Sequence, residues 1–137
     1  MSLLVLDTSA AVPLLFSSHD AHRVVTYYLG KRTVSIAVHS ALETYSVLTR
    51  LPGDARHAPA DAALLLADRF GTPVALDHEI AAGLVGDFAR LGIAGGAVYD
   101  ALIAVTAKAA GGVLLTRDRR AAATYAQLAV DCELIGG

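Results

Sequence analysis

The chain has little cysteine, little charge and no long apolar run. Its single cysteine, Cys132, excludes an internal disulfide framework and a cysteine-rich zinc site, and this usage is typical of a reducing compartment. No stretch reaches the ~18 to 20 unbroken apolar residues that a membrane-spanning helix needs. Asp7 interrupts the N-terminal apolar run too early for a signal peptide. We therefore expect a cytoplasmic protein with no membrane segment.

The net charge is also small, at -2, with a sequence pI near 6.2. Bulk attraction to nucleic acid is therefore absent, which argues against a DNA coat protein but not against an enzyme with a local basic rim. The 5 histidines include no H-x-x-x-H pair and form no recognisable zinc motif. These absences leave the acidic residues as the main candidates for chemistry.

Apolar residues are what the chain has in excess: they make up 55% of its 137 positions, against 18% for charged residues. The length is that of one ordinary domain, so we expect a single folded unit over residues 1–137. Much of its surface must be alanine or be covered by another chain. The composition therefore predicts an oligomer or a bound partner.

Short apolar runs alternate with longer, alanine-rich stretches. The runs with strand character lie at 3–6, 33–37, 73–76 and 112–116, with a weaker one at 128–134. The stretches with helical spacing lie at 9–29, 40–50, 59–70, 77–91, 96–110 and 119–126. Strands that alternate with helices indicate a parallel sheet covered on both faces, because crossovers are right-handed. The expected fold class is α/β, a doubly wound parallel sheet with helices on both faces.

Two acidic residues follow predicted strands. Asp7 ends the first strand, and Thr8 or Ser9 could cap the helix after it. Asp118 comes two residues after Thr116, which we expect to cap the last helix. Asp118 would then lie in the first helical turn, where the helix dipole favours a negative charge. Each of these acids could be purely structural.

Two more acids lie near predicted helix starts. Ser40 and Glu43 have the spacing of a capping box, in which each side chain pairs with a free backbone N–H. Asp100 shares its predicted helix with one other charged residue, Lys108, so most of that helix should be buried. An unpaired buried carboxylate costs several kcal/mol, and the helix dipole recovers only part of that cost.

Taken together, the four acids predict a site. In open parallel sheets, sites form outside the carboxyl ends of the strands, and a helix that follows a strand begins at the same edge. Four mutually repelling carboxylates should therefore line one cleft: Asp7, Glu43, Asp100 and Asp118. Oxygen-only ligation suits Mg²⁺ or Mn²⁺, which can activate water and stabilise charge on a phosphate. The predicted reaction class is phosphodiester hydrolysis.

The segments "VLDTSA", "HSALETYSVLTRL", "GGAVYDALIAVTA" and "LLTRDRRA" resemble the PIN-domain ribonucleases, and most closely the VapC toxins of bacterial toxin–antitoxin pairs. The likeness runs in order over essentially the whole chain. The family's acidic quartet, its catalytic metal ligands, matches Asp7, Glu43, Asp100 and Asp118. Thr116 matches a small hydroxyl residue that helps to orient the site, and we expect Ser9 to support it as well.

The resemblance further implies Mg²⁺ or Mn²⁺ as cofactor, RNA as substrate, a homodimer, and a small VapB-like antitoxin that folds over the cleft. Arg117, Arg119 and Arg120 could contact RNA phosphates, although exposed residues at a helix start are more often only solvated. Asp77 and Tyr99 could also reach the cleft. We expect instead that Asp77 caps the helix after it and that Tyr99 packs in the core.

Other protein classes fit the sequence less well. A phosphoacceptor receiver domain needs adjacent acids after its first strand, where Thr8 and Ser9 stand, and a haloacid-type phosphatase needs an acid at position 9. A catalytically silent PIN-like binding module is the alternative from a different class. Such a module has no need to keep four mutually repelling acids, so we expect an enzyme.

Overall fold

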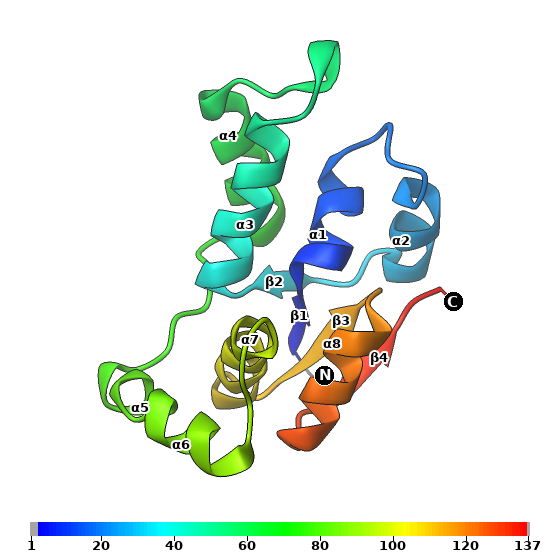
Figure 1. The fold of residues 1–137 in the computed structure, drawn as a ribbon. Coiled ribbons are helices and arrows are strands. Elements are labelled where there is room, and N and C mark those ends of the chain that lie inside the picture. The colour runs from blue at the N-terminus through cyan, green and yellow to red at the C-terminus, as the bar shows by residue number, and fades with distance from the viewer. Residues whose placement is uncertain (1–2, 137) are drawn as a thin grey trace.

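The computed structural model describes residues 3–136, and a parallel sheet of four strands organises them (Figure 1). The strands are β1 (Leu3–Leu6), β2 (Val34–Ile36), β3 (Gly112–Thr116) and β4 (Cys132–Leu134). Their spatial order is β2-β1-β3-β4, and each neighbouring pair is parallel. The predicted doubly wound α/β fold is confirmed. The chain leaves β1 toward β2 on one side and returns to β3 on the other, so the strand order reverses between β1 and β3.

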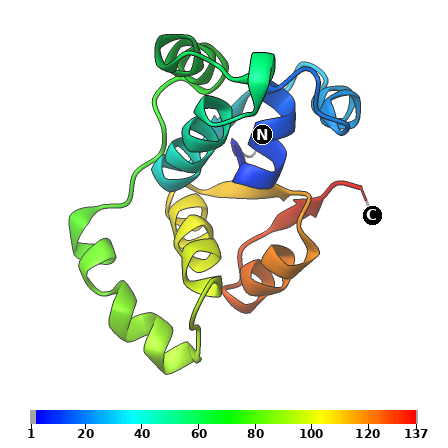
Figure 2. The ribbon, with the colours of Figure 1, turned by 45° about the horizontal axis from the view of Figure 1, so that its top comes forward.

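Helices connect the strands and cover both faces of the sheet. They are α1 (Thr8–Leu15), α2 (His22–Leu29), α3 (Val38–Thr49), α4 (Pro59–Phe70), α5 (His78–Ala82), α6 (Leu84–Leu91), α7 (Ala97–Ala109) and α8 (Arg119–Gln127), with a 3-10 turn at Gly53–Ala55. Figure 2 shows α1 to α4 on one side of the sheet and α7 and α8 on the other. Within residues 3–136, no helix is both long enough and apolar enough to cross a membrane.

Each face of the sheet has its own core because alternate strand residues point to opposite faces. Leu4 and Leu6 pack with residues of α1, α2 and α4, including the buried Phe70. Val5, between them, packs with α7 and α8 on the other face, where Tyr125 is fully buried. A strand buried on both faces needs nearly continuous apolar residues, which is why β1 and β3 show no polar alternation.

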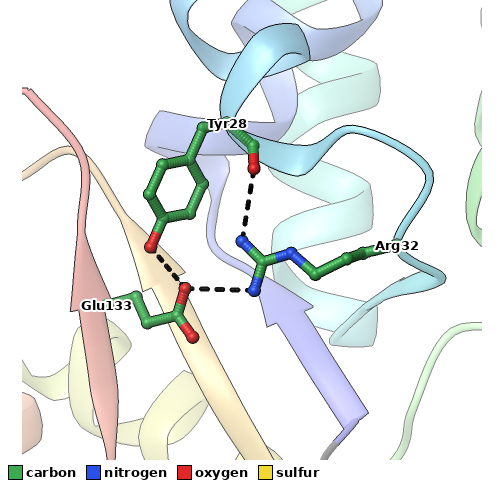
Figure 3. Close-up of polar contacts among 3 residues, drawn as sticks. All are labelled: Tyr28, Arg32 and Glu133. Atoms are coloured by element: carbon green, nitrogen blue, oxygen red, sulfur yellow. Dashed lines mark hydrogen bonds and ion pairs between the residues drawn. The ribbon is translucent and has the colours of Figure 1, made fainter.

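The edge strand β4 is tied to α2 by a polar cluster on the surface (Figure 3). The Tyr28 hydroxyl donates to Oε1 of Glu133 at 2.5 Å, and Nη1 of Arg32 donates to the same oxygen at 3.3 Å. The Arg32 guanidinium also lies over the Tyr28 ring, 5.0 Å from its centroid. These contacts join two segments that are about a hundred residues apart in sequence.

Two predicted helices are each divided in the structure. The predicted helix 9–29 is α1 and α2, because the intervening residues 16–21 form turns in which the backbone N–H of Ala21 donates to Nδ1 of His19. The predicted helix 77–91 is α5 and α6, which meet at Gly83. Both divisions occur where side chains or glycine offer the backbone an alternative to the helical pattern.

Two predicted strands are shorter than expected. The run at 73–76 forms only an isolated bridge between Ala37 and Val74, since Pro73 has no N–H to extend a ladder. The run at 128–134 is a strand only at Cys132–Leu134. Its first residues complete the turn after α8, in which Ala129 has a φ of 57°.

Candidate active site

The switch point of the sheet carries an acidic cleft of about 270 Å³. Its lining includes all four predicted acids: Asp7, Glu43, Asp100 and Asp118. The structure therefore brings the four acids together, as their positions at the carboxyl ends of the strands predicted. The rest of the lining consists of Thr8, Ser9, Ile103, Ala121 and Tyr125.

Asp7 is the most buried of the four acids, with 3% of its surface exposed. Its own side chain caps α1, so neither Thr8 nor Ser9, the two caps considered from the sequence, takes that position. Its Oδ1 accepts hydrogen bonds from the Ser9 hydroxyl at 2.6 Å and from the Ala10 N–H at 3.3 Å. Burial raises the pKa of Asp7 above its ordinary value, and the hydrogen bonds oppose that rise.

Tyr125 is a site residue that the sequence analysis missed. It lies on α8, is fully buried, and its hydroxyl donates to Oδ2 of Asp7 at 2.8 Å. Burial and then the charge of Asp7 raise the pKa of Tyr125, so its hydroxyl stays protonated and acts as a donor. Its spacing of seven residues from Asp118 places both on one face of α8, and this was the available signal.

Asp118 is the N-cap of α8, and its Oδ1 accepts from the Arg120 N–H at 2.9 Å and the Ala121 N–H at 3.4 Å. The expectation that Thr116 caps this helix is therefore wrong. Thr116 ends β3 instead, and its Oγ1 accepts from the Asp118 N–H at 3.0 Å. Its hydroxyl also lies 3.2 Å from that of Ser9, which links the loops after β1 and β3.

Glu43 lies in the second turn of α3, and the expected capping box with Ser40 does not form. The helix starts earlier, at Val38, without a side-chain cap, and the Ser40 hydroxyl is buried with no hydrogen-bond partner within the described chain. The carboxylate of Glu43 instead points across to α1. Its Oε1 accepts from the Thr8 hydroxyl at 2.8 Å and lies 3.4 Å from Nε2 of His39.

Asp100 lies in the first turn of α7 and is half-buried. Burial, followed by the charges of Asp118, Asp7 and Glu43, raises its pKa, while the charge of Arg120 lowers it. The other three acids are thus close enough to act on Asp100 electrostatically. This repulsion distinguishes a shared site from four unrelated helix-start residues.

The donor set suits a hard divalent cation, because Mg²⁺ and Mn²⁺ prefer carboxylate oxygens and a cation would relieve the repulsion at Asp100. In their present positions, no three His, Cys, Asp or Glu side chains of residues 3–136 form a group that could hold an ion. Mg²⁺ binds through one or two carboxylates and keeps several waters, so it needs no such compact group. The residues present therefore fit a hydrated ion.

The three arginines differ in position. Arg117 is half-buried, and its Nη1 donates to the Ser9 carbonyl at 3.3 Å, whereas Arg119 and Arg120 are exposed. Arg120 lines a second hollow of about 400 Å³, which shares Asp100 and Asp118 with the acidic cleft. Arg120 is thus the arginine placed beside the acids.

The two further candidates also lie outside the cleft lining. Asp77 precedes α5 in the N-cap position, but its exposed side chain makes no capping hydrogen bond. The expectation that Tyr99 packs in the core is wrong, since 57% of its surface is exposed. Its ring stacks on that of His39 at the side of the cleft.

Comparisons with known proteins find relatives over most of the chain. The sequence model of the PIN domain family matches residues 4–127. Ribonuclease VapC27 of Mycobacterium tuberculosis is 46% identical over 127 residues, which cover 93% of each chain. Ribonuclease VapC40 of the same species is 45% identical over 130 residues, covering 94% of this chain and 96% of VapC40.

Two solved structures have the same fold. FitAB bound to an IR36 DNA fragment has a TM-score of 0.67 and 20% identity, covering 96% of this chain and 94% of that one. VapBC2 from Rickettsia felis, bound to a DNA fragment from their promoter, has a TM-score of 0.67 and 16% identity, covering 96% and 98%. The chain therefore belongs to the PIN domain family and, within it, to the VapC proteins.

Proposed function

We propose that this VapC-family chain is the toxin of a toxin–antitoxin pair and hydrolyses RNA phosphodiester bonds with Mg²⁺ or Mn²⁺. The acids that would hold the hydrated ion, directly or through its waters, are Asp7, Glu43, Asp100 and Asp118. The observation that carries the proposal is the convergence of these four acids on one cleft at the switch point of the sheet. The relatives VapC27 and VapC40 are named ribonucleases, which supports the same activity.

A bound divalent cation would supply an activated water and would neutralise charge on the phosphate. The chain's own residues hold the ligands for that task. Tyr125 and Ser9 fix the two oxygens of Asp7, and Thr8 fixes one oxygen of Glu43. Oδ1 of Asp7 accepts two hydrogen bonds, from Ser9 and Ala10, whereas Oδ2 accepts one, from Tyr125, and keeps a further lone pair. These hydrogen bonds position the acids without consuming their capacity to bind a cation.

The proposal includes a VapB-like antitoxin, a homodimer and a cytoplasmic location. Large apolar side chains are exposed on α2 and α3, namely Val24, Tyr27, Val38 and Leu42. Such surfaces commonly mark contacts with other chains. Light scattering at micromolar concentration should give about twice the mass of 14.2 kDa. A monomer mass alone would contradict the homodimer.

The activity is tested with purified protein and a panel of RNAs. Cleavage should require Mg²⁺ or Mn²⁺ and stop in excess EDTA. Asp100→Asn should reduce cleavage by about 100-fold or more, as expected for loss of a reacting group. Asp61→Asn is the matched control, because Asp61 also lies in the first turn of a helix but is exposed on α4.

Two outcomes would contradict the proposal. Cleavage that persists in chelator, once contaminating nucleases are excluded, would remove the metal mechanism. A wild-type protein that cleaves no RNA, yet binds RNA or an antitoxin, would be the catalytically silent module instead.

A further inference from the structure

A stacked pair of aromatic rings lies beside the acidic cleft. The rings of His39 on α3 and Tyr99 on α7 have centroids 5.3 Å apart and planes that differ by 7°. Nε2 of His39 lies 3.4 Å from Oε1 of Glu43, and Tyr99 immediately precedes Asp100. The pair therefore adjoins two of the four acids.

One face of the Tyr99 ring is covered by His39, yet 57% of the residue's surface is exposed. No other ring within residues 3–136 is found stacked on Tyr99, and more than half of the residue stays open to solvent. A single exposed aromatic side chain needs no explanation by itself. Tyr99 differs from such a residue because a stacking partner holds its ring at the edge of a candidate active site. The ring therefore offers a flat, oriented π surface to a molecule that enters the cleft.

The helices place this pair and the second hollow on opposite sides of the acids. α7 lies between α3 and α8 (Figures 1 and 2). Successive residues of a helix are turned by about 100°, so Tyr99 and Ala97 flank Asp100 on its two sides. Tyr99 meets α3, whereas Ala97 lines the hollow with Arg120 of α8. An extended nucleic-acid strand laid across the acids would meet both the ring pair and the second hollow.

We propose that Tyr99, held by His39, is a stacking platform for one nucleobase of the RNA substrate, next to the phosphate that enters the cleft. This inference rests on the proposed ribonuclease function. Proteins recognise unpaired RNA bases by stacking them on aromatic side chains. The net charge of -2 gives little general attraction to the RNA backbone, so contacts with bases carry more of the binding.

The first test compares three variants on a short RNA that the wild type cleaves. Stacking of one base contributes about 1–3 kcal/mol, so Tyr99→Ala should raise KM by roughly 5- to 150-fold and change kcat by less than about twofold. Tyr99→Phe, which keeps the ring, should stay within about twofold of wild type. Val85→Ala is the control, since Val85 is 84% exposed on α6 and lies outside the cleft lining. An unchanged KM in Tyr99→Ala would overturn the inference.

The second test asks whether Tyr99 contacts a base. RNAs with one abasic nucleotide at successive positions are bound to protein carrying Asp100→Asn, which holds RNA without cutting it. One abasic position should weaken binding about tenfold when Tyr99 is present and have little further effect when Tyr99 is alanine. If no abasic position shows this dependence on Tyr99, the inference is also overturned.

The alternative occupant of this surface is a protein. In that case Tyr99→Ala changes the oligomeric mass in sedimentation, or weakens antitoxin binding, while KM for RNA stays constant. That result would make the pair a protein contact and overturn the inference. If the wild type cleaves RNA and Tyr99→Ala cleaves it equally well, only the platform fails. If the wild type cleaves no RNA, the proposed function itself fails.

Discussion

At Asp7, a buried carboxylate is held on one oxygen by the helix that follows it and on the other by a distant helix. Ser9 and Ala10 donate to Oδ1 from the helix that Asp7 begins, and Tyr125 donates to Oδ2 from α8. Burial raises the pKa of Asp7, whereas these hydrogen bonds lower it. Tyr125 therefore fills the core beneath the cleft and also favours the ionised form of Asp7.

Tyr125→Phe tests this role because it removes the hydroxyl and keeps the ring. With one hydrogen bond lost, the pKa of Asp7 should rise further, and the acidic limb of the pH–rate profile for RNA cleavage should move to higher pH. The unpaired Asp7 oxygen should lower the free energy of unfolding by about 1–3 kcal/mol in urea titrations. Tyr27→Phe, on the exposed face of α2, is the control. An acidic limb at the wild-type pH would contradict the positioning role.

Asp100 provides a second prediction at the scale of one residue. Burial and the other three acids raise its folded pKa above the ordinary value of 3.8, so the folded state binds more protons than the unfolded state. Its contribution to stability is thus intact below pH 3.8 and is lost as pH rises through the raised folded pKa. In EDTA, Asp100→Asn should melt at a higher temperature than wild type at pH 7. The difference in melting temperature should vanish near pH ~3, where residue 100 is uncharged in the wild type and in the mutant. A lower melting temperature of Asp100→Asn than of wild type at pH 7 would show that Asp100 only stabilises the start of its helix.

Among the elements, local signals located the helices and strands better than their caps. The helix at 59–70 was predicted to its ends, since Pro59 suits a first turn and Gly71 closes the helix with a positive φ. The Ser40–Glu43 capping box was wrong for a reason outside the local sequence. The Val38 N–H already donates to the Val74 carbonyl at 2.9 Å, which lets α3 begin two residues before Ser40.

The site, too, has features that the sequence predicts and features that depend on contacts between distant elements. Convergence of the four acids was predictable because the carboxyl ends of parallel strands share one edge. The contact of Tyr125 with Asp7 and the stacking of Tyr99 on His39 depend instead on how α7 and α8 pack against their neighbours. The two members of each pair lie far apart in the chain, as with the 118 residues between Asp7 and Tyr125, so no local spacing joins them.

The tie between α2 and β4 gives a prediction for elements. Tyr28→Phe removes the hydroxyl that donates to Glu133 but keeps the ring beneath Arg32. Because the cluster is exposed, the free energy of unfolding should fall by no more than about 1 kcal/mol. Hydrogen exchange of amides in α2 should nevertheless accelerate, since local opening needs fewer broken contacts. Tyr27→Phe should leave exchange unchanged. Equal exchange in the two variants would show that the cluster does not hold α2.

For the whole molecule, the cleft couples cation binding to folding. An ion that binds the folded chain and not the unfolded chain stabilises it by RT ln(1 + [L]/Kd), about 2.7 kcal/mol at a hundred times Kd. Mg²⁺ or Mn²⁺ should therefore raise the melting temperature of the wild type in a concentration-dependent way. Ca²⁺ offers a comparison with an ion whose coordination geometry is more flexible. Asp100→Asn should start from a higher temperature in EDTA and gain less from metal, because the mutation removes both the repulsion and a ligand. Asp61→Asn, which removes an exposed carboxylate of α4 outside the cleft lining, should gain as much as wild type. Equal metal-induced gains in all three proteins would place the cation outside the four-acid cleft, whatever the RNA cleavage assay shows.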